Sequence, residues 1–382
     1  MIARLAAFIL LAVPACADPA PEASKAFGAP TAQRLLRVQS TTDIDLIAPV
    51  LNAFAGLHPN LRIDYQQWGS NELYRVSAQA CAGQGPVADF VFSSAVDLQV
   101  RLVNDGCAQA YASAPTRALP LAANWRDELF GLTREPAVLV YNRALVPPSE
   151  APQSRFDLLD LLRREDGRYD GKVATYDIEA SGLGYLFAFA DADQATTFGS
   201  LLEGFGRAHS VATCCSAEII TGVEEGRWLI AYNVLGSNAL ARAAVNPNLV
   251  VVAPQDYTLI LQRSGLIPKG AANPADAGAL IDFLLSDLGR QLLAETHLIV
   301  DPAKINPDDP SAPLSKDDAT MLRPIPLSPI LLVGNDRHRR AAFVHLKRPA
   351  APKGRCVIHE GLAPLRPPRP WRCPRTRRSG RS

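Results

Sequence analysis

Two stretches of the sequence share one pattern, in which an apolar strand ends in hydroxyl residues and an amphipathic helix begins at once. They are LLRVQSTTDID over 35–45 and DFVFSSAVD over 89–97. Thr42 stands three positions before Asp45, and Ser94 three before Asp97, which is the spacing of a capping box with Asp in place of Glu. Such a junction leaves backbone N–H groups and hydroxyls at the carboxyl edge of a parallel sheet, where open α/β folds bind small ligands. The pattern therefore predicts an α/β protein that binds a ligand.

The rest of the sequence continues the alternation of strands and helices. Apolar runs predict strands, and a helical stripe over 277–288 ends at Gly289. Apart from the first two, the predicted strands cover 61–65, 137–141, 172–178, 229–233, 249–253 and 257–261. Helices alternate with these strands, so the fold class is α/β. The length between the N-terminal segment and residue 346 allows two domains.

The N-terminus has the features of a secretory signal peptide over 1–17. Arg4 precedes an apolar run from Leu5 to Val13, and the small residues Ala15-Cys16-Ala17 follow. We expect cleavage before Asp18 and export to the periplasm. Two alternatives remain: a lipid anchor on Cys16, and a buried N-terminal helix.

The charge of the chain is unevenly distributed. The C-terminal tail, 347–382, holds 11 Lys or Arg, one acid and seven prolines. Without this tail and the signal peptide, 27 basic and 37 acidic residues remain, a net charge of −10, which argues against a nucleic-acid partner. The tail is predicted to be disordered, because its few apolar residues cannot offset the entropy of ordering. A polybasic arm and a tail without selected function are both compatible with this composition.

Export to an oxidising compartment bears on the cysteines. Cys81 and Cys107 each end a predicted crossover helix, and consecutive crossover helices finish at the same edge of a parallel sheet. A disulfide between them is therefore geometrically reasonable, with two buried thiols as the alternative. Cys214 and Cys215 are adjacent and have no His or Cys at metal-ligand spacing. A vicinal disulfide, or one buried and one exposed thiol, are both open for this pair.

Four strings of residues carry a resemblance to a known family. They are SSAVDLQ at 93–99, EPAVLVYN at 135–142, SGLGY at 181–185 and AYNVLGS at 231–237. In this order and spacing they resemble the extracellular solute-binding proteins of ABC importers, in the branch that includes ferric-iron binders. The resemblance runs from about residue 35 to 346 and omits the tail.

The resemblance implies a two-lobed periplasmic-binding-protein fold with two hinge crossings and a ligand cleft between the lobes. Lobe one would comprise 35–136 and 257–346, lobe two 137–256, and 18–34 would be an N-terminal linker. The crossings would lie near 137–142 and 253–257. The implied partner is an ABC permease, and the protein is expected to be a monomer without a cofactor.

The resemblance also places residues at the cleft. On lobe one these are Ser40, Thr41, Thr42, Ser93 and Ser94, with Glu135 beside the hinge. On lobe two they are Ser181, Gly182, Leu183, Tyr232 and Asn233. The hydroxyls could instead only cap helices, and Glu135 could instead pair with Arg134 or Arg143.

The chemistry of these residues favours a small anionic solute, since hydroxyls and N–H groups at helix N-termini receive anions. Ferric binders of this branch use neighbouring tyrosines, whereas this sequence has Tyr232 followed by Asn233. Iron therefore remains an alternative, with Tyr232 as its ligand and an anion or chelator completing the site. A sensor that signals to a membrane histidine kinase would use the same closed form. An enzyme is the least favoured class, because catalytic motifs such as H-E-x-x-H and G-x-S-x-G are missing from the sequence.

Overall fold

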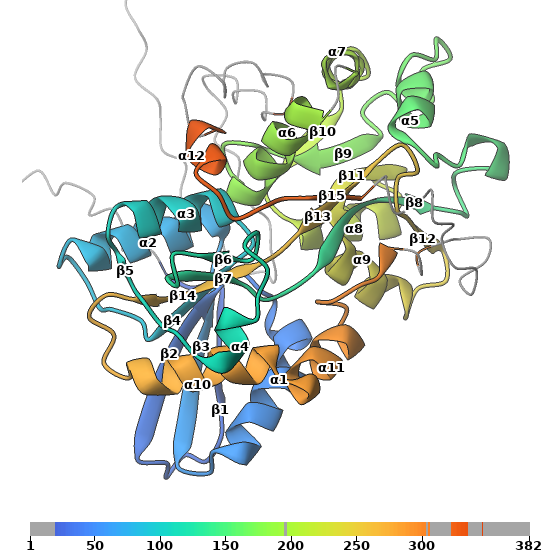
Figure 1. Cartoon of the computed structure of the whole chain (residues 1–382). Helices are drawn as coiled ribbons and strands as arrows, with labels where there is room; N and C mark the ends of the chain where they lie inside the picture. The colour runs from blue at the N-terminus through green and yellow to red at the C-terminus, as the bar shows by residue number, and fades with distance from the viewer. Residues whose placement is uncertain (1–19, 195–196, 303–304, 306–321, 335–345, 347–382) are drawn as a thin grey trace, which may run out of the picture. The chain divides into compact units, whose positions relative to one another are not determined.

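A computed structural model describes residues 20–194, 197–302, 305, 322–334 and 346. The strands of these residues form two sheets (Figure 1). The first sheet has eight strands, seven of them in the order β1 (Ala23–Phe27), β3 (Leu61–Gln67), β2 (Arg34–Ser40), β4 (Phe90–Ser93), β14 (Ser264–Pro268), β7 (Leu129–Gly131) and β6 (Asn124–Trp125), and β5 (Ala108–Gln109) pairs with β14. The second has seven, six of them in the order β10 (Val211–Thr213), β9 (Val173–Tyr176), β11 (Ile230–Leu235), β8 (Glu135–Asn142), β13 (Thr258–Leu261) and β15 (Leu322–Pro324), and β12 (Leu249–Val252) pairs with β8.

Helices follow most of these strands. Their bounds are α1 (Ile44–Leu57), α2 (Ser70–Cys81), α3 (Val96–Asn104), α4 (Ala114–Arg117), α5 (Arg155–Leu162), α6 (Gly182–Gln194), α7 (Phe198–Arg207), α8 (Ser216–Glu224), α9 (Gly236–Ala243), α10 (Pro274–Leu285), α11 (Asp287–Glu295) and α12 (Ile330–Gly334), with a 3₁₀ turn at Pro148–Glu150. Strand β2 is parallel to β3 and β4, and β9 is parallel to β10 and β11. Parallel strands bring their carboxyl ends, and so the starts of the following helices, to one edge of each sheet.

Apolar periodicity explains how the helices pack. In α1, Ile47, Leu51 and Phe54 recur at helical spacing and are buried in the core of the first sheet, with Leu36 and Ile63. A second core packs against the second sheet, and a third contains buried residues of both sheets, among them Val91 of β4 and Val140 of β8. The predicted α/β class is therefore confirmed by elements that alternate as the sequence pattern indicates.

The predicted lobe boundaries need correction. The segment 18–34, expected as a linker, contains β1, which pairs antiparallel with β3 as an edge strand of the first sheet. The chain passes from β7 to β8 at 132–134 and from β13 back to β14 at 262–263, not near 137–142 and 253–257. Strands β13 and β15 lie in the second sheet, so 257–346 does not belong to lobe one alone.

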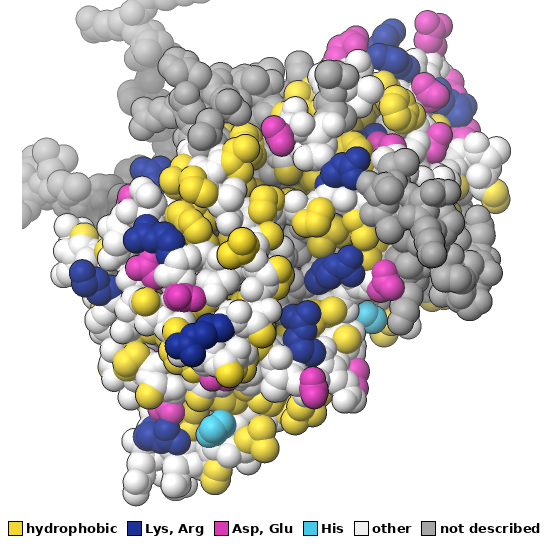
Figure 2. Space-filling model, viewed as in Figure 1, with side chains coloured by type: hydrophobic (Ala, Val, Ile, Leu, Met, Phe, Trp, Pro, Cys, Tyr) yellow, Lys and Arg dark blue, Asp and Glu magenta, His cyan; other side chains and the backbone are white. Residues whose placement is uncertain are grey.

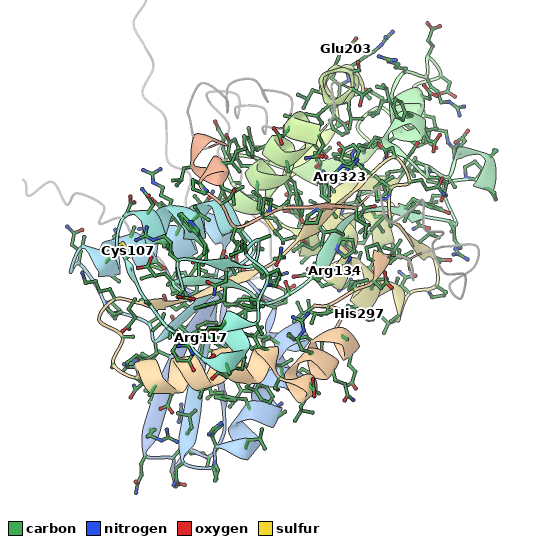
Figure 3. All side chains as sticks on the ribbon, viewed as in Figure 1. Cys107, Arg117, Arg134, Glu203, His297 and Arg323 are labelled. Carbon is green, nitrogen blue, oxygen red and sulfur yellow. A yellow bond between two sulfur atoms is a disulfide. The ribbon has the colours of Figure 1, made fainter. Side chains whose placement is uncertain are left out.

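The predicted disulfide between Cys81 and Cys107 is present in the structure. Its Cα atoms lie 5.4 Å apart, within the usual range for a disulfide. Cys81 is the last residue of α2, and Cys107 (labelled in Figure 3) follows α3. The bridge therefore joins the carboxyl ends of two consecutive crossover helices, away from the sheet edge where the helices begin.

The remaining sequence predictions concern the surface and the ends of the chain. Figure 2 shows basic side chains interspersed with acidic ones on the face it presents, not gathered into a basic stripe. Among the described residues, none of the helices has the length and apolar character needed to cross a membrane. The signal peptide 1–17, Cys16 and the tail 347–382 lie outside the described residues.

Candidate functional site

In the first sheet, strands β2 and β4 each lead directly into the loop before a helix or its start, and a serine at the end of each strand hydrogen-bonds to that loop. Ser40 Oγ accepts a hydrogen bond from the Thr42 backbone N–H at 3.0 Å, and Ser93 Oγ accepts one from the Ala95 N–H at 3.1 Å. The N-cap residues are Asp43 for α1 and Ala95 for α3, and neither makes a side-chain cap bond. The predicted capping boxes are therefore wrong, because the serines shape the turn and each helix begins later than expected.

Thr41 and Ser94 join the two junctions. Thr41 Oγ1 accepts a hydrogen bond from the Ser94 backbone N–H at 2.9 Å, and the two hydroxyl oxygens lie 3.1 Å apart. Both residues line a cavity between the two sheets. By contrast, Ser40, Thr42 and Ser93 are buried behind them and do not line it. The structure thus brings together the lobe-one hydroxyls named from the sequence, but only two of the five face the cavity.

On the opposite side, the start of α6 faces the start of α2. Ser181 Oγ accepts a hydrogen bond from the Gly184 N–H at 3.1 Å, and Ser181 and Leu183 line the cavity. The Gly182 N–H donates to Ser70 Oγ at 2.9 Å, and Asn71 Nδ2 donates to the Glu179 carbonyl at 2.8 Å. Gly182 therefore links the two sides instead of facing the cavity.

Six helices begin at this cavity, which has a volume of about 190 Å³. The lining residues at or just before the helix starts are Asp43 for α1, Gly69 and Ser70 for α2, Ser94 for α3, Ser181 for α6, Cys215 and Ser216 for α8, and Leu235 for α9. A helix start carries backbone N–H groups that have no partner within the helix, and about half a positive charge. Some of these groups bond to nearby side chains, such as Gly182 N–H to Ser70 Oγ and Ile44 N–H to Gln67 Oε1. The part of the cavity wall that the helix starts form can consequently attract an anionic group.

Arg263 and Glu135 form a buried ion pair beside the cavity. Arg263 Nε donates to Glu135 Oε1 at 2.8 Å, and Arg263 Nη1 donates to Thr42 Oγ1 at 3.2 Å. Glu135 also accepts hydrogen bonds from Thr133 and Ser237 and is completely buried. The prediction that Glu135 contacts ligand is not supported by this geometry, and its partner is Arg263 instead of Arg134 or Arg143.

Tyr232 and Asn233 do not reach the cavity. The Tyr232 hydroxyl donates to Asp191 Oδ2 at 2.7 Å and accepts from Arg155 Nε at 2.9 Å, and Asn233 Nδ2 donates to Asp191 Oδ2. Burial raises the pKa of Tyr232 well above its usual value, so the phenolate is disfavoured. In the structure these two residues, predicted from the sequence to contact ligand, belong instead to the buried polar network of Arg155 and Asp191.

Several cavity residues were missed by sequence reasoning. Trp68, Tyr176, Ser216, Asn238 and Arg263 all line it. Tyr176 ends β9 and Ser216 begins α8, so both repeat the junction pattern, and their hydroxyls bond to each other at 2.5 Å. Trp68 directly follows β3, and Arg263 directly precedes β14. The loops that hold them carry no distinctive sequence motif.

Three carboxylates, Glu22, Asp43 and Glu72, also line the cavity from the lobe-one side. Burial, with smaller contributions from Asp43 and Glu72, raises the pKa of Glu22 above its ordinary value. Asp43 accepts hydrogen bonds from Gln67 Nε2 at 2.9 Å and from Asn238 of α9 across the cavity. The acidic side of the cavity can therefore accept hydrogen bonds from hydroxyl or amine groups.

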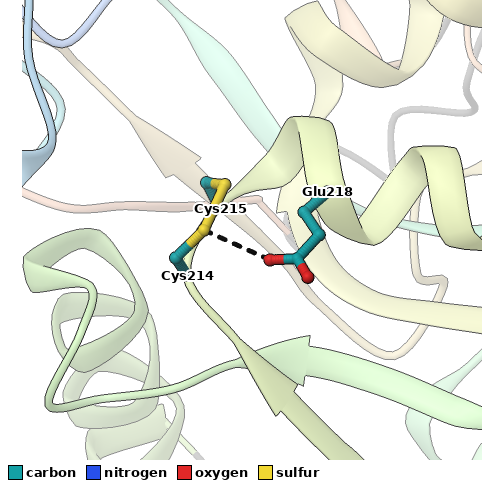
Figure 4. Close-up of side chains that lie close together, drawn as sticks. All are labelled: Cys214, Cys215 and Glu218. Atoms are coloured by element: carbon teal, nitrogen blue, oxygen red, sulfur yellow. Dashed lines mark hydrogen bonds between the residues drawn. A yellow bond between two sulfur atoms is a disulfide. The ribbon is translucent and has the colours of Figure 1, made fainter. Parts of the chain in front are cut away.

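Cys214 and Cys215 are joined by a disulfide at the start of α8 and line the cavity. Glu218, in the first turn of α8, brings Oε2 to 3.3 Å from the Cys214 sulfur (Figure 4). With both sulfurs bonded to each other, the group offers a metal ion only the Glu218 carboxylate, which already accepts a hydrogen bond from Thr213. Of the two states left open by the sequence, the structure has the vicinal disulfide.

Comparisons with known proteins agree with this geometry. A family model described as bacterial extracellular solute-binding protein matches residues 85–321. The substrate-binding protein of an ABC transporter from Agrobacterium tumefaciens is 34% identical with a TM-score of 0.76, over 86% of this chain and 100% of that chain. No curated protein matches the chain at the level of sequence.

More distant structures share the fold. Iron-bound HitA from Pseudomonas aeruginosa is 16% identical, with a TM-score of 0.60 over 81% of this chain and 99% of that one. The periplasmic binding protein AfuA from Actinobacillus pleuropneumoniae, with fructose-6-phosphate bound, is 17% identical, with a TM-score of 0.62 over 82% and 97%. The two-lobed periplasmic-binding-protein fold is thereby confirmed. This chain belongs to the family of bacterial extracellular solute-binding proteins.

Proposed function

We propose that the chain captures a small anionic solute, a carboxylate or a phosphorylated compound, and delivers it to an ABC permease. Delivery of solutes to permeases is the work of its family. The observation that supports an anion is the convergence of six helix N-termini on one cavity. Because Arg263 is neutralised by Glu135, the backbone N–H groups supply most of the attraction.

The acidic side of the cavity refines the proposed ligand. Glu22, Asp43 and Glu72 would disfavour an anionic group on their own side of the cavity, but they would accept hydrogen bonds there from hydroxyl or amine groups of the ligand. A ligand with its anionic group toward the starts of α6 and α8 and its hydroxyl or amine groups toward Glu22 satisfies both sides. A phosphorylated sugar has this combination, and AfuA offers a precedent at the level of fold.

Ferric iron is the second candidate, since HitA carries iron. The geometry argues against iron binding through Tyr232 here, because Tyr232 lies in the Arg155–Asp191 network, away from the cavity. Tyr176, which does line the cavity, bonds to Ser216, and burial raises the pKa of its hydroxyl. An iron site with a tyrosinate ligand would therefore need deprotonated Tyr176, and burial in the cavity wall disfavours that phenolate.

We place the mature protein in the periplasm after cleavage before Asp18, with a lipid anchor on Cys16 as the alternative. Intact-mass analysis of the exported protein distinguishes the two. A sensor role would need contact with a membrane kinase in place of a permease. Loss of solute uptake in a deletion strain supports transport, whereas loss of a transcriptional response with normal uptake supports sensing.

The anion is tested by thermal shift with matched compounds, fructose 6-phosphate against fructose and citrate against ferric citrate. Saturation at 100 times Kd should stabilise the protein by about 2.7 kcal/mol. The proposal predicts stabilisation by fructose 6-phosphate and not by fructose, and stabilisation by citrate in the absence of iron. Equal stabilisation by fructose, or stabilisation by ferric citrate alone, would contradict it.

Two adjacent serines make a matched pair for locating the site. Ser94→Ala removes a hydroxyl from the cavity wall and should weaken anion binding by about 1–2 kcal/mol. Ser93→Ala removes a buried hydroxyl that only bonds within its loop, so it should lower stability and leave affinity unchanged. Equal affinity of both variants and the wild type would show that the cavity is wrongly assigned.

A further inference from the structure

We propose that Cys214–Cys215 is a reversible thiol–disulfide modification site that sets the anion affinity of the cavity. The inference rests on the proposed function, because it concerns the same cavity. The pair is half-buried, lines the cavity and lies where α8 begins. A soluble dithiol can reach it whenever the cavity is open to solvent.

The position of each sulfur suits the reduced state as well as the oxidised one. A disulfide sulfur has no proton to donate, so the 3.3 Å approach of Cys214 Sγ to Glu218 Oε2 becomes a hydrogen bond only when Cys214 is a thiol. Cys215 is the N-cap of α8, where the positive end of the helix stabilises a thiolate. Reduction therefore leaves Cys214 as a thiol held by Glu218 and Cys215 as a thiolate.

The adjacency of the two cysteines also favours reduction. Consecutive Cα atoms lie 3.8 Å apart, below the separation of about 4.4–6.8 Å found in ordinary disulfides. Disulfides that depart from this geometry are more easily reduced. The Cys81–Cys107 bridge, with a separation of 5.4 Å and one cysteine buried, is the internal control.

The reaction is two-electron thiol–disulfide exchange with a dithiol reductant of the thioredoxin-fold class. A thiolate of the reductant attacks Cys214 Sγ, the S–S bond breaks, and Cys215 leaves as the stabilised thiolate. The second thiol of the reductant then attacks the mixed disulfide, which releases Cys214 and oxidises the reductant to its own disulfide. Cys214 takes up one proton, and the other passes to solvent.

The consequence for binding follows from charge. The oxidised pair is neutral, whereas the reduced pair adds one negative charge to a wall that otherwise attracts anions. Reduction should weaken binding of an anion by roughly tenfold, the size expected for two like charges several ångströms apart near a protein surface. By linkage, a bound anion should make the pair harder to reduce by the same factor, which corresponds to about 30 mV for two electrons.

The experiment uses the full exported protein, with inorganic phosphate and fructose 6-phosphate as probes. Affinity is measured by calorimetry under anaerobic conditions before and after dithiothreitol, and thiols are trapped with iodoacetamide for peptide mass spectrometry. The proposal predicts that Cys214 and Cys215 are alkylated at dithiothreitol concentrations that leave Cys81–Cys107 intact. It also predicts that reduction weakens the affinity of the wild type and of a Cys81→Ser/Cys107→Ser variant by roughly tenfold.

A Cys214→Ser/Cys215→Ser variant should not respond to dithiothreitol. Anion binding that is the same in oxidised and reduced wild-type protein would overturn the inference, as would a response that persists in this variant. Failure of both probes to bind the oxidised protein is a separate result, which counts against the proposed anionic ligand. Selective trapping of Cys214 and Cys215 would still support the modification site in that case, and reduction of Cys81–Cys107 first would refute it.

Discussion

Replacing Tyr232 by phenylalanine separates stability from ligand binding. The substitution removes one hydroxyl that donates to Asp191 Oδ2 at 2.7 Å and accepts from Arg155 Nε at 2.9 Å, with all three side chains buried. Each hydrogen bond to a charged group contributes about 1.5 kcal/mol or more, so Tyr232→Phe should lower the free energy of unfolding by about 3 kcal/mol. Because Tyr232 does not line the cavity, the affinity for an anion should not change.

Tyr176→Phe is the matched control. Tyr176 is also completely buried, but it lines the cavity, and its hydroxyl bonds to the neutral Ser216. This variant should lose only about 1 kcal/mol of stability and bind an anion about fivefold more weakly. Urea unfolding followed by circular dichroism and calorimetric titration measure the two quantities. If Tyr232→Phe weakened binding as much as Tyr176→Phe while stability stayed at the wild-type level, our assignment of Tyr232 to a structural network would be refuted.

Three further substitutions test other parts of the account. Glu22→Gln removes a carboxylate from the cavity wall, so calorimetry should show tighter anion binding, and weaker binding would mean that Glu22 holds the solute. Cys81→Ser/Cys107→Ser opens a loop of 27 residues counted inclusively and should cost about 3 kcal/mol in urea unfolding; an unchanged midpoint would contradict this. Burial lowers the pKa of His297 (labelled in Figure 3) below its usual 6.5, so the unfolded chain binds more protons and stability falls as pH drops through 6.5. Asparagine suits the left-handed backbone at position 297, so His297→Asn tests this contribution without straining the chain. Thermal unfolding as a function of pH should show a smaller loss of stability below pH 6.5 in this variant. A pH profile equal to that of the wild type would exclude a contribution from His297.

The sequence was informative wherever the site depends on local pattern. Thr41, Ser94 and Ser181 could be located because each follows a strand and precedes a helix, and parallel strands bring such junctions together. Tyr232 and Asn233 also end a strand pattern, but their partners Arg155 and Asp191 come from distant helices, so their burial could not be read from neighbouring residues.

The lobe boundaries failed for a related reason. The strand over 257–261 was found correctly from its apolar run, but its sheet is decided by pairing with β8, more than a hundred residues away. Arg263 was missed because only the passage between the two sheets brings it to Glu135. Periodicity locates strands and helices, whereas long-range pairing decides which lobe and which cavity a residue belongs to.

The central claim is that an anionic group binds where the helices begin around the cavity. A crystal structure of the protein with the anion that gives the largest thermal shift tests it most directly. We predict density for the anionic group within hydrogen-bond reach of backbone N–H groups at the starts of α6 and α8, near Ser181 and Ser216. Density for that group beside the three carboxylates Glu22, Asp43 and Glu72, or a metal ion there in its place, would contradict the account.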